Sequence, residues 1–207
     1  MKKIKKVFVM MMLIVMAAIT LTLPTQAAGK RKAVRVVYKR EYKNNKEFMR
    51  VKGLDSKKKV VWKYTTKKHT ATELDSTYCV RRKNKNKVYI FDSKKIILKR
   101  KSDGKTLWTA KASPAGHVYK FDKKENLYVT GYYDDNVYKI SAKGKRVWKT
   151  NVSKTGNYWP YSSQKEKIRI SGDKLIIPYD RNEKDTDSGK KHKVVFSTKT
   201  GEILEYS

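Results

Sequence analysis

The sequence predicts an all-β fold made of consecutive antiparallel units, and two observations lead to that prediction. The 207-residue chain is well supplied with valine, isoleucine, tyrosine and tryptophan, which favour strands. In addition, three tryptophans end similar phrases, Asp55–Trp62, Ser102–Trp108 and Ser141–Trp148. Self-similarity at a spacing near 40 residues is typical of repeat architectures, in which one supersecondary unit follows another.

The N-terminal segment has the parts of a secretory signal peptide. A lysine-rich start is followed by an apolar run, Val7–Leu23, and then by small residues that include Ala27. We expect cleavage after Ala27, which makes residues 1–27 the signal peptide and residues 28–207 the repeat domain. Cleavage after Ala28 and retention of the run as an uncleaved anchor are the alternatives. On this prediction the protein is secreted or associated with the cell surface.

The repeat reads as strand, turn, strand, a glycine–lysine turn, and a strand that carries tryptophan. The residues expected to hold it together are its tryptophans and turn glycines, namely Trp62, Gly104, Trp108, Gly144, Trp148 and Gly201. In the first copy Lys58 takes the glycine place, and in the weaker fourth copy Glu205 takes the tryptophan place. Glycine permits a tight turn, while tryptophan is large enough to fill space between packed units.

Further strand-like runs precede these phrases, at Val34–Tyr38, Val88–Asp92, Leu127–Gly131 and Leu175–Tyr179. An additional strand is expected in the later units, at Thr77–Arg82, Gly116–Phe121 and Lys165–Ser171. The units therefore span approximately residues 30–66, 72–112, 116–153 and 160–207. One sheet cannot bury both of its apolar faces alone, so we expect four antiparallel blades of a small β-propeller or of an open propeller-like arc. Four unrelated hairpins in a sandwich are the alternative.

The phrase Ser102–Trp108, and Ser141–Trp148 nearly as well, resembles the PQQ-like repeat of quinoprotein-type β-propellers. In that repeat a glycine–lysine turn leads into a strand with tryptophan, and the resemblance covers about residues 34–207. Quinone-dependent members need a calcium site, and many have a vicinal disulfide. Cys79 is the only cysteine, and no calcium constellation matches. The resemblance therefore implies the non-catalytic branch, without a quinone cofactor, either as a closed ring, an open arc or half a ring completed by a second copy.

Charge is the feature from which we infer a function. The chain has 51 Lys and Arg residues against 19 Asp and Glu residues, a formal net charge of +32. Such a charge attracts polyanions in a salt-dependent way, and many basic runs fall at predicted turns on the rims of the blades. We expect a non-enzymatic binding or scaffold protein on anionic cell-wall or matrix polymers. The densest basic stretch supplies the expected polyanion-binding residues, Arg81, Arg82, Lys83, Lys85 and Lys87.

Two functions from other classes stay open. One is a protein–protein module of the cell envelope that offers exposed strand edges, and the other is a hydrolase or lyase acting on an acidic polysaccharide. The three histidines have no metal-ligand spacing and no nucleophile elbow occurs, so we predict no catalytic residue, metal or cofactor. Asp185–Gly189 resembles the start of a calcium loop but lacks the later glutamate. We also expect a buried thiol at Cys79 and a hairpin turn at Asp134–Asn136.

Overall fold

The computed structural model describes residues 30–44, 46–70, 78–81, 86–92, 94–112, 118–131, 134–152, 158–160, 168–181 and 192–206. The chain divides into two units, Met1–Arg31 and Lys32–Ser207, and all the described strands belong to the second. The predicted signal peptide lies outside the described residues. Within the described ranges, no helix is long and apolar enough to cross a membrane.

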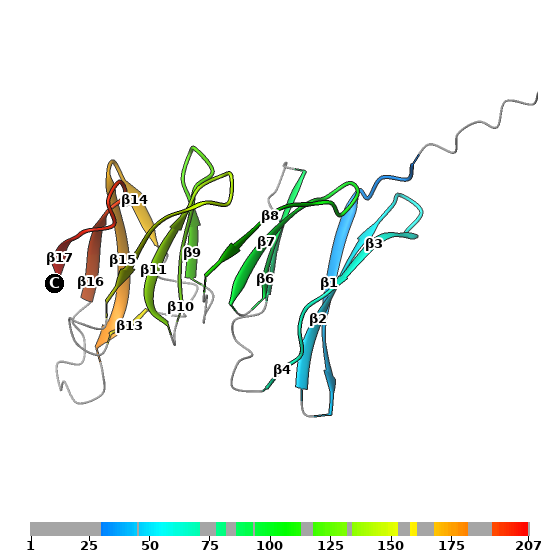
Figure 1. Cartoon of the computed structure of the whole chain (residues 1–207), viewed down its shortest axis with the longest axis horizontal. Helices are drawn as coiled ribbons and strands as arrows, with labels where there is room; N and C mark the ends of the chain where they lie inside the picture. The colour runs from blue at the N-terminus through cyan, green and yellow to red at the C-terminus, as the bar shows by residue number, and fades with distance from the viewer. Residues whose placement is uncertain are drawn as a thin grey trace, which may run out of the picture. The chain divides into compact units, whose positions relative to one another are not determined.

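The second unit contains four antiparallel sheets, formed in chain order (Figure 1). The first sheet consists of β1 (Arg35–Lys43), β2 (Lys46–Leu54), β3 (Val60–Thr65) and β4 (His69–Thr70). The second consists of β5 (Tyr78–Arg81), β6 (Lys87–Asp92), β7 (Lys95–Arg100) and β8 (Thr106–Lys111). The third consists of β9 (Val118–Phe121), β10 (Leu127–Gly131), β11 (Asp134–Ile140) and β12 (Arg146–Asn151). The fourth consists of β13 (Tyr158–Pro160), β14 (Arg169–Ser171), β15 (Lys174–Arg181), β16 (His192–Ser197) and β17 (Ile203–Tyr206).

These sheets confirm the all-β prediction and most of its strands. The additional strands expected in the later units are β5, β9 and β14. In the first sheet, where no such strand was evident, β4 pairs with β2 instead. The hairpin turn predicted at Asp134–Asn136 is wrong, because Asp134 already pairs with Gly131 in β10 and Asn136 pairs with Asn151 in β12. Ladder hydrogen bonds on both sides thus override the turn preference of these polar residues.

Every sheet has the same irregularity in its last hairpin. In the first sheet Gly53 lies opposite Trp62 while Leu54 lies opposite Val60, which leaves Val61 as an extra residue. Register shifts at the equivalent place leave one extra residue in each of the other sheets, at Leu107, Val147 and Leu204. A β-bulge of this kind bends the strand and increases its twist. Its recurrence shows that the four sheets are copies of one unit.

The core lies between consecutive sheets. One buried cluster combines Met49 of β2 with Ile90 of β6, a second combines Tyr89 of β6 with residues of the third sheet, and a third joins Tyr128 of β10 to the fourth sheet. Because side chains alternate along a strand, Tyr89 and Ile90 are buried on opposite faces of the second sheet. The clusters join each sheet to the next, so the described fold is an open, propeller-like series of blades.

Candidate functional site

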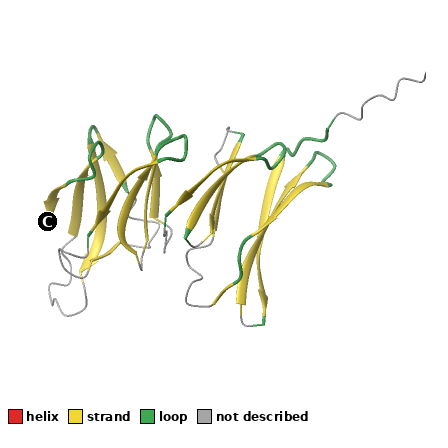
Figure 2. Ribbon diagram, viewed as in Figure 1, coloured by secondary structure: helices red, strands yellow, loops and turns green. Residues whose placement is uncertain are grey.

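Four hairpin turns, which precede β3, β8, β12 and β17, lie on the same side of the sheets (Figure 2). Each turn has one residue with positive φ, namely Lys58 (61°), Gly104 (72°), Gly144 (83°) and Gly201 (78°). Backbone hydrogen bonds close the turns, as where Gly144 donates its N–H to Ser141 O at 2.8 Å. A positive φ suits glycine, and the first turn accepts it at a lysine. The glycine–lysine motif therefore encodes a fixed backbone conformation.

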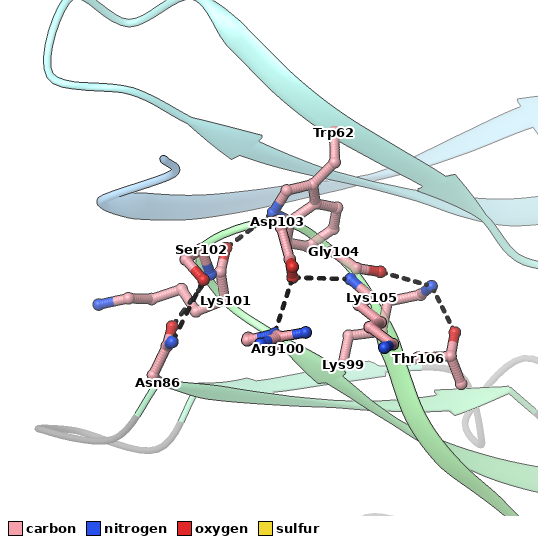
Figure 3. A network of polar contacts seen from close by, with 10 residues as sticks. All are labelled: Trp62, Asn86, Lys99, Arg100, Lys101, Ser102, Asp103, Gly104, Lys105 and Thr106. Atoms are coloured by element: carbon pink, nitrogen blue, oxygen red, sulfur yellow. Dashed lines mark hydrogen bonds and ion pairs between the residues drawn. The ribbon is translucent and has the colours of Figure 1, made fainter. Parts of the chain in front are cut away.

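Each tryptophan of the repeat reaches the turn of the following sheet. The indole N–H donates a hydrogen bond to a turn carbonyl, from Trp62 to Lys101 O at 2.7 Å, from Trp108 to Ala142 O at 3.0 Å and from Trp148 to Thr198 O at 3.2 Å. Figure 3 shows Trp62 lying over the turn that contains Gly104. The three contacts join the first sheet to the second, the second to the third, and the third to the fourth.

The turn glycines have a second role in this contact. A Cβ built on Gly104 would lie 2.5 Å from Cγ of Trp62, and a Cβ on Gly144 would lie equally close, 2.5 Å, to Cγ of Trp108. A Cβ on Gly201 would lie 2.6 Å from Cδ2 of Trp148. Carbon atoms in favourable contact are about 3.5–4.0 Å apart, so the indole occupies the space of the missing side chain. We call each indole–carbonyl bond with its glycine contact a Trp–turn lock.

One buried and one half-buried lysine, Lys99 and Lys139, strengthen two of the turns. Lys99 donates from Nζ to Thr106 Oγ1 at 2.9 Å and to Gly104 O at 3.2 Å, within the network of Figure 3. Its Nζ also lies 4.9 Å from the centre of the Tyr64 ring. Lys139 donates to Thr198 O at 2.6 Å. Burial lowers the pKa of both amines below the ordinary lysine value, and both are committed to internal partners.

A set of exposed lysines lies on the turn side of the sheets. These are Lys57, Lys58, Lys59, Lys105, Lys143 and Lys145, which we call the turn lysines. None of their side chains makes a hydrogen bond or ion pair with another residue that the structure describes. Lys59, Lys105 and Lys145 directly follow the positive-φ residue in the first three sheets, whereas Glu202 takes that place in the fourth.

The carboxylates in the turns bind groups of their own turn. Asp55 accepts the backbone N–H groups of Lys57 at 3.0 Å and Lys59 at 2.8 Å. Asp103 accepts the N–H of Lys105 at 3.0 Å, and this bond, followed by the charge of Arg100 at 3.1 Å, lowers the pKa of its carboxyl. These aspartates bond to the backbone N–H groups of the turn and fix its conformation, and they do not pair with the side chains of the turn lysines.

The predicted polyanion-binding stretch is described only in part. Arg81 lies in β5, but its side chain is not described, and Arg82, Lys83 and Lys85 lie outside the described residues. Lys87 forms an ion pair with Glu125, which joins the second sheet to the third. The role of this stretch therefore stays a prediction, and Lys87 already has an internal partner.

The sequence predicts no catalytic residue and no metal site, and it singles out Asp185–Gly189 and Cys79 only as a partial calcium-loop resemblance and a buried thiol. No group of three histidine, cysteine or acidic residues in the described part of the chain could hold a metal ion. Asp185–Gly189 lies outside the described residues, and Cys79 belongs to β5 without a described side chain. The structure thus leaves the predictions for these residues untested.

No protein-family model matches the chain, and no curated protein matches it. Among solved structures, BamB from Moraxella catarrhalis is similar with a TM-score of 0.49 and 18% identity, over 81% of this chain and 47% of that chain. Kuenenia stuttgartiensis hydrazine synthase has a TM-score of 0.49 and 14% identity, over 78% of this chain and 45% of that chain. The chain thus spans about half the length of these two proteins. Its described part is an open, propeller-like series of four antiparallel sheets.

Proposed function

We propose that the protein is a secreted, non-enzymatic scaffold that binds anionic cell-wall or matrix polymers through its turn lysines. The observation that carries the proposal is the presence of exposed lysines at equivalent places in three successive turns, without partners among the described residues. Removal of residues 1–27 takes four lysines and no acidic residue from the chain's +32 and leaves a formal net charge of +28, whose positive potential draws polyanions to this surface.

Lysine chemistry suits a polymer that is recognised by charge. An ammonium on a flexible four-carbon stem pairs with phosphate or carboxylate without a demand for bidentate geometry. Binding releases the counterions that had condensed on the polymer, which makes affinity fall steeply with salt. Trp–turn locks fix the turns that carry Lys105 and Lys145 before binding, and Asp55 holds the first turn, so mainly lysine side chains lose freedom when the polymer docks. A linear polyanion that crosses successive turns fits this arrangement.

The test compares two triple variants that lose the same charge. In the turn variant, Lys59, Lys105 and Lys145 are replaced by Gln. In the control variant, Gln replaces three exposed lysines in the strands of the first sheet, Lys39, Lys52 and Lys63. Binding to inorganic polyphosphate and to polygalacturonate is measured over a salt series, which separates phosphate from carboxylate recognition.

We expect the slope of log K against log salt to fall by about 2 in the turn variant, since each lost contact to a flexible polyanion removes about 0.7. The control variant should keep most of its slope, because only the overall potential changes. Equal losses in the two variants would show that net charge alone binds the polymer and would overturn the assignment to the turns. Absence of binding to both polymers at low salt would overturn the proposed function.

Secretion is tested separately, at the N-terminus of the protein recovered from its own cells. We expect the mature chain in the extracytoplasmic fraction to begin at Ala28, as the predicted cleavage requires. A chain that keeps Met1 and stays with the membrane would support the uncleaved anchor instead.

A further inference from the structure

The series of Trp–turn locks stops at a changed residue on each side. At the first turn, Lys58 stands where the later turns have glycine, with the same positive φ of 61°. At the last strand, Glu205 lies opposite Val195, as Trp148 lies opposite Lys139 in the preceding sheet. Both positions are thus equivalent to lock positions by backbone geometry, and both have a charged side chain in place of the lock residue.

A Trp–turn lock needs a turn that accepts the indole, and Lys58 prevents the first turn from doing so. At the three lock glycines, the place of a Cβ is within 2.5–2.6 Å of an indole carbon. Lys58 has a real Cβ at this place, so an indole cannot approach its turn to the same depth. Its backbone otherwise repeats the turn around Gly144, since Lys58 donates its N–H to Asp55 O at 3.1 Å. The Cβ is therefore the part of the first turn that excludes an indole.

A lock also needs an indole N–H donor, and Glu205 does not supply one. A carboxylate has no N–H to offer to a turn carbonyl, and two oxygens with partial or full negative charge repel each other. The Glu205 carboxylate instead pairs with Lys193 Nζ at 3.0 Å, and both side chains stay more than 40% exposed, at 44% and 42%. The last strand therefore presents a hydrated ion pair where the other sheets present an indole.

We infer that Lys58 and Glu205 are end caps that prevent a second copy of the chain from joining this one through a Trp–turn lock. A stack of repeats grows wherever an end offers the same apolar contact as its interior, and polar terminal repeats stop that growth. Lys58 is also one of the turn lysines, but the inference can fail independently of the proposed function, because it is tested by association between copies of the chain without polymer. It predicts that restoring the lock residues creates complementary ends.

The test uses the variants K58G and E205W of the whole chain, separately and mixed. E205W supplies a donor without an acceptor, and K58G supplies an acceptor without a donor. We expect each variant alone to sediment as one chain, and the equimolar mixture to sediment as a one-to-one pair. The double variant K58G/E205W has both ends restored, so it should form larger species whose size increases with concentration. K58G keeps the turn folded, because glycine adopts a φ of 61° without strain.

A fourth variant, K58A, isolates the Cβ. It removes the lysine charge but keeps the carbon that excludes the indole, so it should fail to pair with E205W. Pairing of E205W with K58A or with the unchanged chain as strong as with K58G would overturn the inference, because the Cβ would then not be the barrier. A mixture of E205W and K58G that stays unpaired, with far-ultraviolet circular dichroism equal to that of the unchanged chain, would overturn it as well.

Discussion

Replacement of Gly144 by Ala tests whether the turn glycines serve the Trp–turn lock or only the turn. The new methyl would adopt a φ of 83°, which costs an L-residue about 1–2 kcal/mol. It would also lie 2.5 Å from Cγ of Trp108, so the indole must move by about 1 Å to restore ordinary contact. Overpacking of this kind costs about 1–3 kcal/mol. The displaced ring also weakens its 3.0 Å bond to Ala142 O, worth about 1 kcal/mol.

The matched control is Gly172→Ala, because Gly172 has a φ of 55° but no atom within 4 Å of a built Cβ. We expect a loss of about 1–2 kcal/mol for Gly172→Ala and of about 2–5 kcal/mol for Gly144→Ala, from the contributions of backbone and contact. In a Trp108→Ala background, Gly144→Ala should cost only the backbone part. Urea unfolding followed by circular dichroism gives these free energies. An equal cost of Gly144→Ala in the two backgrounds would refute the lock.

Three smaller changes test individual buried groups. Burial and the Asp122 charge raise the pKa of Tyr128 to about 12, so the neutral phenol stabilises the fold below pH 10, and this stabilisation is lost between pH 10 and 12. Tyr128→Phe should therefore flatten the loss of stability in that range, and an unchanged pH profile would contradict this. Glu47 is buried, with no hydrogen bond from a described residue and an ion pair to Arg40 at 3.6 Å, so Glu47→Gln should leave the melting temperature unchanged or higher. Asp92 accepts the Tyr64 hydroxyl at 3.0 Å, so Asp92→Asn should cost about 1–3 kcal/mol in the same melting experiment.

Much of the fold could be predicted from the sequence because the unit is repeated. The phrases around Trp108 and Trp148 share a glycine, a lysine and an apolar residue at fixed spacing, and the structure forms equivalent hairpins there. The residue that each indole contacts could not be predicted, since it belongs to the next sheet and depends on packing. The β-bulge before each tryptophan was also missed, because Leu107 and Val147 look like ordinary strand residues.

The candidate site was harder to predict for a physical reason. A run such as Arg81–Lys87 stands out in the sequence by its charge density, but Lys87 forms an ion pair with Glu125 of another sheet. The turn lysines are distributed along the chain, and the packing of consecutive sheets brings them to one side. Linear charge density therefore identified a basic protein, whereas the position of each lysine in the repeat unit identified the candidate surface.

The candidate surface formed by the turn lysines ends at the fourth sheet, where acidic residues occupy the equivalent positions of the repeat. Glu202 replaces the lysine that follows the turn glycine, and Lys199 pairs with Asp173 at 2.7 Å. The same sheet has Glu205 where a further lock would begin. Acidic residues thus appear together at the binding position and at the lock position of one unit. If the proposal and the inference both hold, Glu202→Lys should strengthen polyphosphate binding without changing sedimentation, while E205W paired with K58G should change sedimentation at any salt concentration that preserves the fold.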